Sequence, residues 1–194
     1  SEKKTILFLG TTKFLYWVEF NVYSAVNSTF IKELNKINDF VNLLSEQEKA
    51  FFIFRPRKLS HFWDTAQVLQ FKEKGIRIDN SEFYESIQQS RIIIINHIST
   101  GIAEILMMKA PFLLLLDVDL ILYPNELAPI FQALKDCRVI HTTAQSAKDH
   151  ISLIYDNVQG WWESKSVQDA VNKLVDISLA PPSKTTDFLL SLLK

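Results

Sequence analysis

The chain has 194 residues and a formal net charge of −1, from 21 basic and 22 acidic side chains, which argues against a nucleic-acid partner. Hydrophobic residues make up 47% and charged residues 22%, as in an ordinary globular protein with a sizeable core. A single cysteine excludes an internal disulfide, and no apolar stretch reaches the roughly 18–20 residues of a transmembrane segment.

The apolar pattern predicts short strands that alternate with helices along the chain. Strands are expected at 5–9, 49–54, 76–78, 91–95, 112–116 and 139–140. Helices are expected at 29–44, 62–74, 81–89, 102–110, 124–135, 147–155, 166–178 and 187–193, with a loop at 156–162. This alternation favours a single α/β domain over residues 1–194, a Rossmann-like doubly wound parallel sheet with helices on both faces and a C-terminal helical extension from about residue 161.

The most informative segment is the strand Ile92–Ile95 and the turn that follows it. Four consecutive isoleucines indicate a strand buried on both faces, and a helix and a second apolar run follow, so the segment is a βαβ unit. The turn contains Ser99, Thr100 and Gly101 at a helix start, where backbone amides can bind a phosphate. For the triplet alone, an ordinary N-cap formed by Ser99 or Thr100 is the better interpretation.

The spacing downstream of the turn carries a family resemblance. Glu104 lies four residues after Thr100, and Pro111 lies seven residues after Glu104. The segment from Ser99 to Pro111 resembles the nucleotide-sugar half of GT-B glycosyltransferases. The resemblance implies that Ser99, Thr100 and Gly101 bind the donor phosphate and that Glu104 binds the ribose hydroxyls. The segment departs from the family at one position, because many members have glycine where Met108 or Lys109 stands.

The likeness extends to a group of bacterial surface-carbohydrate transferases related to Kdo-type enzymes that use CMP-activated sugars. It rests on Arg55-Pro56-Arg57, an acidic stretch near Asp79, His97 and the pair Trp161-Trp162. It covers only the C-terminal half of those proteins. The resemblance therefore implies an N-terminal acceptor domain that this chain lacks, and the missing initiator Met suggests an excised piece of a longer protein.

Several further residues are candidates for the same site. Arg55 and Arg57 follow a strand and can bind phosphate or a sugar carboxylate, although surface ion pairs are an equally good reading. His97 can donate to a phosphate or hydroxyl, against the alternative of a buried histidine bonded to backbone. Thr11 and Thr12 follow the first strand after Gly10, where an ordinary turn is as good a reading, and no G-x-G-x-x-G fingerprint is present.

The resemblance implies transfer of a sugar from a nucleotide-activated donor, with a CMP-linked sugar as one option, to a surface-carbohydrate acceptor. It implies no cofactor and no metal, since the donor is a substrate, and it leaves the catalytic residue unassigned. We expect a cytoplasmic protein without a transmembrane segment, compatible with peripheral attachment at the inner membrane face. We also expect the isolated chain to bind its donor without turnover. The alternative is a non-catalytic α/β interaction module with a flavodoxin-like outline.

Overall fold

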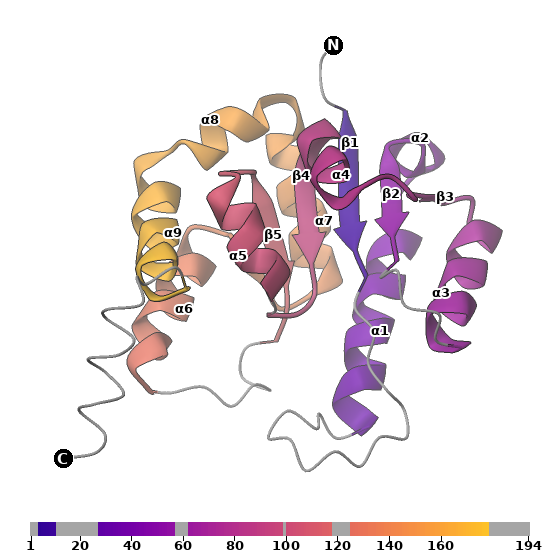
Figure 1. Ribbon diagram of the computed structural model, residues 1–194, viewed down its shortest axis with the longest axis horizontal. Helices are drawn as coiled ribbons and strands as arrows, with labels where there is room; N and C mark the ends of the chain where they lie inside the picture. The colour runs from indigo at the N-terminus through magenta and orange to yellow at the C-terminus, as the bar shows by residue number, and fades with distance from the viewer. Residues whose placement is uncertain (1–3, 11–26, 57–61, 99, 118–124, 179–194) are drawn as a thin grey trace.

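A computed structural model describes residues 4–10, 27–56, 62–98, 100–117 and 125–178 (Figure 1). In this part of the chain six strands form one parallel sheet, in the order β3-β2-β1-β4-β5-β6. The strands are β1 (Thr5–Leu9), β2 (Phe52–Arg55), β3 (Arg77–Ile78), β4 (Ser90–Ile95), β5 (Phe112–Leu115) and β6 (Ile140–His141). The predicted doubly wound α/β fold is confirmed.

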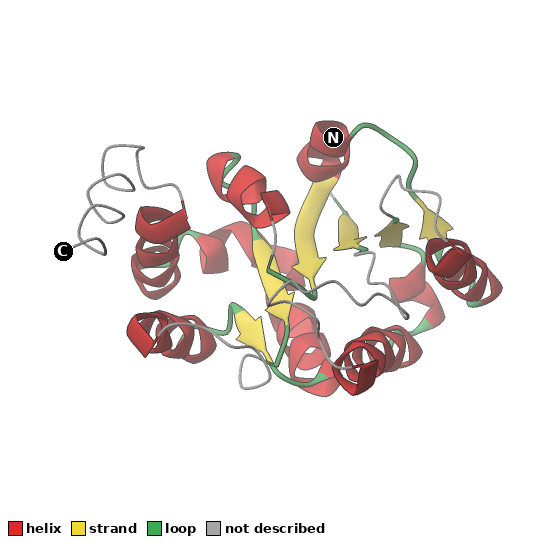
Figure 2. Cartoon of the chain, turned by 60° about the horizontal axis from the view of Figure 1, so that its bottom comes forward, coloured by secondary structure: helices red, strands yellow, loops and turns green. Residues whose placement is uncertain are grey.

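Helices cover both faces of the sheet, which Figure 2 shows as red elements on either side of the yellow strands. One face is covered by α1 (Asn27–Asn42), α3 (Phe62–Glu73) and α7 (Ala144–Ile154). The other is covered by α4 (Phe83–Gln89), α5 (Thr100–Met107), α6 (Ala128–Asp136) and α9 (Lys165–Ser178). Shorter helical turns are α2 (Glu46–Lys49), η2 (Asn125–Leu127), η3 (Tyr155–Asn157) and α8 (Val158–Trp162).

The apolar strands are explained by burial on both sides. Successive side chains of a strand point to opposite faces, and here both faces are covered. Ile92 and Ile94 pack under α1, α3 and α7, whereas Ile93 and Ile95 pack under the helices of the other face. All four are at most 1% exposed. The run of isoleucines thus forms the centre of two cores at once.

The segment before β2 corrects the predicted strand at 49–54, because Lys49 ends a short helix and β2 begins only at Phe52. The Ser45 hydroxyl accepts a hydrogen bond from the Glu48 amide, and the Glu48 carboxylate accepts one from the Ser45 amide. This reciprocal capping box stabilises the helical turn. The Ser-x-x-Glu spacing is the sequence signal for this helical turn, and the apolar run that follows it is the stronger signal for a strand.

The predicted loop at 156–162 is also wrong, since η3 and α8 occupy this segment. The Asn157 side chain caps α8 by accepting a hydrogen bond from the Gly160 amide at 3.1 Å. A Cβ atom at Gly160 would lie 2.5 Å from the Asn157 amide nitrogen. Gly160 therefore leaves room for the cap inside a helix, although glycine usually signals a loop. The predicted helix at 187–193 lies outside the described residues.

Candidate functional site

The strand order reverses between the two central strands, β1 and β4, which are themselves parallel. The chain moves from β1 to β2 and β3 on one side, and from β4 to β5 and β6 on the other. The paired residues Leu9–Arg55 and Leu9–Ile95 show that these strands end at the same level. Open α/β sheets bind ligands outside the carboxyl ends of their strands at such a switch point. Figure 1 shows α5 starting at this edge, where β4 ends.

The predicted turn after β4 lies at this switch point. Asn96 is 5% exposed, His97 is partly buried and Ile98 is half exposed. The Asn96 Oδ1 atom lies 3.2 Å from His97 Nδ1. Helix α5 begins at Thr100, so its first amides point towards the carboxyl edge with the positive end of the helix dipole. The structure thus places a helix start at the position where the sequence predicts a phosphate site.

Gly101 and Glu104 share one face of α5, because residues three apart are neighbours on a helix. Both are partly exposed. Among the described residues, the Glu104 carboxylate has no hydrogen-bond or ion-pair partner. The helix face beside the switch point thus presents an acceptor-only side chain that can bind a ligand hydroxyl.

Several predicted site residues cannot be placed. Ser99, Arg57, Thr11 and Thr12 lie outside the described residues, and Thr100 is described only as the first residue of α5. Their assignments stay predictions. The structure brings His97, Gly101 and Glu104 together on one turn and helix, and it places Arg55 two strands away from β4.

Arg55 is 8% exposed and sits in a buried polar network. Its Nη1 atom donates to Ser86 Oγ at 2.9 Å and to the backbone carbonyl of Ser81, and it lies 3.3 Å from Asp79 Oδ2. The guanidinium carbon also lies 5.8 Å from the centre of the Phe83 ring. Arg55 therefore ties the end of β2 to the segment after β3 and to α4, a role that the sequence did not reveal.

Asp79 is the anionic partner in this network. Burial by itself would raise the pKa of Asp79, but hydrogen bonds from Ser86 and Ser81 and the charge of Arg55 outweigh it, so the pKa lies below its ordinary value. The carboxylate accepts from the Ser86 hydroxyl and from the Ser81 amide. The network is thus neutralised internally.

His141 of the edge strand β6 and His150 of α7 form a buried pair. His141 and His150 are each 3% exposed, and His141 Nε2 lies 3.0 Å from His150 Nδ1. His141 Nε2 is also 2.9 Å from the Arg138 carbonyl, and His141 Nδ1 is 2.8 Å from Ser146 Oγ. These contacts assign the proton of neutral His141 to Nε2, with Nδ1 accepting from Ser146. The His150 ring meets Trp161 edge to face, with centroids 5.0 Å apart.

Burial lowers the pKa of both histidines to about 4. The charges of His141 and Arg138 lower the pKa of His150 further, and the charge of Arg138 also lowers the pKa of His141. Both rings are therefore neutral near pH 7. Sequence features indicate this pair only weakly, because a predicted strand end marks His141 and nothing marks His150.

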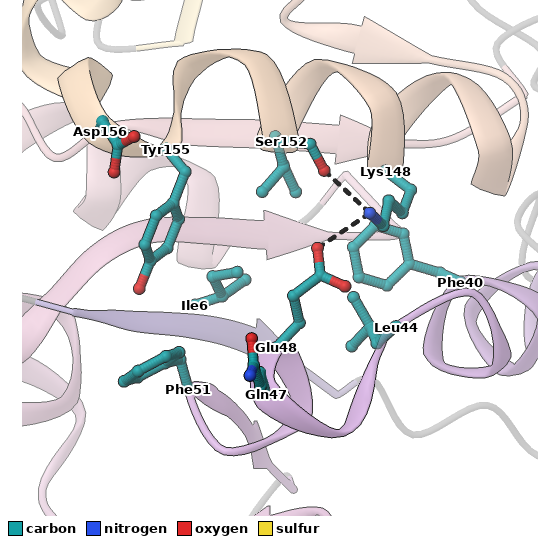
Figure 3. A pocket seen from close by; sticks show the side chains of 11 residues that line it. Ile6, Phe40, Leu44, Gln47, Glu48, Phe51, Lys148, Ser152, Tyr155 and Asp156 are labelled. Atoms are coloured by element: carbon teal, nitrogen blue, oxygen red, sulfur yellow. Dashed lines mark hydrogen bonds and ion pairs between the residues drawn. The ribbon is translucent and has the colours of Figure 1, made fainter.

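A separate pocket of about 240 Å³ opens near the amino ends of β1 and β2, between α1, α2 and α7 (Figure 3). Glu48 and Lys148 bridge it with an ion pair of 2.8 Å, and Lys148 also donates to Ser152 Oγ at 2.9 Å. Burial by itself would raise the pKa of Glu48, but hydrogen bonds from Lys148 and Ser45 lower it overall. None of the predicted site residues lines this pocket. Its ion pair fastens α2 to α7, away from the switch point.

Fold and strand ends together define a Rossmann-like α/β protein with a candidate ligand site at its switch point. Comparison with protein families then matches residues 1–177 to the model of the LIC12162 family transferases, and the chain belongs to this family. It is therefore a transferase. No curated protein and no solved structure matches the chain. Within the described residues, no helix has the length and apolar character needed to cross a membrane.

Proposed function

We propose that this transferase binds a nucleotide-activated sugar at the carboxyl ends of β1 and β4. The proposed reaction transfers the sugar to a surface-carbohydrate acceptor. The observation that carries the proposal is the geometry of α5, which starts at the switch point and presents Glu104 without a partner among the described residues. The family supports the transferase class, and the GT-B resemblance of the turn supports the donor class.

The proposed ligand follows from the two kinds of group on α5. Amides at the helix start favour a phosphate, which assigns Ser99, Thr100 and Gly101 to the donor phosphate. Three residues of helix advance about 4.5 Å, so Glu104 lies further along the same face. A nucleotide places its ribose next to its phosphate, and a carboxylate can accept hydrogen bonds from both ribose hydroxyls.

In the proposed reaction the bond between the anomeric carbon and the phosphate oxygen breaks, and the acceptor oxygen forms the new bond. Negative charge then develops on the leaving phosphate, where the α5 amides would stabilise it. His97 lies on the same turn and can donate to this phosphate in the proposal. The acceptor hydroxyl must lose a proton, and we assign its base, together with acceptor binding, to a separate domain. Glycosyl transfer by these 194 residues alone would overturn that assignment.

Thermal-shift measurements with CMP, UDP, GDP, FMN and NAD test the proposal. We expect one of the nucleoside phosphates to raise the melting temperature, since a ligand that binds only the folded state stabilises it. The shift should disappear in Glu104→Ala and persist in Glu126→Ala, a control that removes an exposed carboxylate from η2. Stabilisation by FMN alone would favour the flavodoxin-like alternative, and no shift with any nucleotide would overturn the donor site.

A further inference from the structure

Asn96 is the polar residue at which β4 ends, and the donor site proposed above does not use it. Its side chain is 5% exposed although it follows four buried isoleucines. Buried side-chain amides are normally bonded through both their oxygen and their nitrogen, because water cannot replace the missing partners. The partners of Asn96 therefore indicate what its amide does.

The side chain of Asn96 has one described hydrogen bond, between Oδ1 and His97 Nδ1 at 3.2 Å. Among the residues that the structure describes, its Nδ2 group has no acceptor. Turning the amide over would exchange the two atoms and leave the oxygen without a donor instead, so one polar atom is unpartnered in either orientation. An unpartnered buried polar group is costly, and such groups in folded proteins call for a specific explanation.

The position of Asn96 supplies that explanation. It lies at the carboxyl end of a central strand, at the switch point, and just before the turn that leads into α5. We propose that Asn96 is a ligand-contacting residue, whose Nδ2 group donates to a phosphate oxygen of the nucleotide donor while Oδ1 accepts from His97 Nδ1–H. The inference rests on the proposed function and adds to it a specific contact and a tautomer. With the proton on Nδ1, the Nε2 atom of neutral His97 is an acceptor, so the donation from His97 to the phosphate proposed above requires the imidazolium form, which carries a proton on both nitrogens.

Two substitutions separate this role from a structural one. Asn96→Asp keeps an acceptor for His97 but replaces the donor by a carboxylate oxygen. It should weaken nucleotide and pyrophosphate binding by about 10- to 100-fold, the effect of losing a hydrogen bond to a charged group. Asn96→Leu replaces the amide by an apolar side chain of similar shape. This removes an unsatisfied group together with one hydrogen bond to the partly exposed His97, so the ligand-free melting temperature should change little.

The measurements are isothermal titration with CMP, UDP, GDP and pyrophosphate, and thermal melting without ligand. Asn172→Asp, at an exposed position of α9, controls for the added charge and should bind as the wild type does. Wild-type binding that Asn96→Asp leaves unchanged would overturn the Asn96 contact alone. A clearly lower ligand-free melting temperature in Asn96→Leu would also overturn it, because it would show a structural amide. A wild type that binds none of the four probes would overturn the donor site and this inference together.

Discussion

At the carboxyl edge of the sheet, the polar groups of the flanking strands are paired within the fold, whereas those at the centre are not all paired among the described residues. At the flanks, beside β2 and β6, Arg55 bonds to Asp79 and Ser86, and His141 bonds to His150. Each of these networks is buried and internally neutral. At the centre, after β4, one polar side-chain atom of buried Asn96 has no partner among the described residues. The Glu104 carboxylate on the neighbouring helix α5 also has no partner among them.

This difference separates two uses of the same strand position. A polar group that folding has already satisfied contributes to stability and has little left to offer a ligand. A buried polar group that has no partner in the folded protein lowers stability, and a ligand that supplies the partner restores that stability when it binds. Strand-end location alone therefore does not identify a site. Substitutions at the flanks should affect unfolding, and substitutions at the centre should affect binding.

The largest effect is expected for Arg55→Met. This change leaves Asp79 without its cation, and the two side chains are only 9% and 12% exposed. Breaking a buried pair by removing one partner should lower the free energy of unfolding by about 3 kcal/mol. Urea denaturation measures this loss. Lys165→Met, which breaks an exposed pair with Asp169, should cost less than about 0.5 kcal/mol.

The Arg55 result also bears on the predicted phosphate role of this residue. If Arg55 contacted the donor, Arg55→Met would weaken nucleotide binding while unfolding changed little. That outcome would contradict the distinction between flank and centre. The double variant with Asp79→Asn should recover part of the lost stability, because it removes the uncompensated carboxylate.

The next largest effect concerns pH. The folded-state pKa of His141 and His150 is about 4, below the ordinary value of 6.5, so the unfolded chain binds more protons between these values. Stability is fully present above pH 6.5 and is lost as the pH falls through 4. A shift of this size corresponds to a loss on the order of 3 kcal/mol for each histidine over this range.

Urea midpoints at pH 7, 5.5 and 4.5 test this expectation, and His150→Phe should flatten the slope. Asp79 and Glu48, whose pKa values are lowered, act in a different range. Their stabilisation is present above their ordinary pKa values of 3.8 and 4.5 and is lost only as the pH falls below these values. Equal stability at pH 7 and 5 would show that the histidine pair is not a buried neutral cluster.

A smaller effect is expected for Gly10→Ala, at the end of β1. A Cβ atom there would lie 2.6 Å from Cε2 of the Phe54 ring and 3.2 Å from the Arg55 carbonyl. The fully buried ring would have to shift, at a cost of about 2 kcal/mol in unfolding free energy. Ser166→Ala, at an exposed position of α9, is the control and should change little. An unchanged denaturation midpoint in Gly10→Ala would show that the strand end is looser than the contact distances imply.

The sequence predicted the fold well because the strands leave few alternatives. Ile92–Ile95 can be buried on both sides only in a covered parallel sheet, and helices of suitable length separate the strands. Short-range polar signals were harder to weigh. Ser45 and Glu48 form a capping box, and Asn157 caps a helix that contains Gly160. Apolar periodicity alone would miss both.

The turn and the helix start that carry the candidate site could be predicted from the sequence, but the hydrogen bonds around them could not. Spacing placed His97, Gly101 and Glu104 at the start of α5, where the structure has them. Residue spacing does not indicate that Arg55 pairs with Asp79, because the two residues are far apart in the sequence. Asn96 likewise has no signal in the sequence, since only its burial together with a missing hydrogen-bond partner marks it.

The smallest expected effect is that of Glu104→Ala on unfolding without ligand. Glu104 is partly exposed and has no described partner, so its removal should change the free energy of unfolding by less than about 0.5 kcal/mol. The same variant should lose the thermal shift caused by the nucleotide. Urea denaturation and thermal shift on one preparation measure both quantities. A loss of stability close to that of Arg55→Met would mean that the centre, like the flanks, is satisfied by folding, and the comparison between them would no longer locate a site.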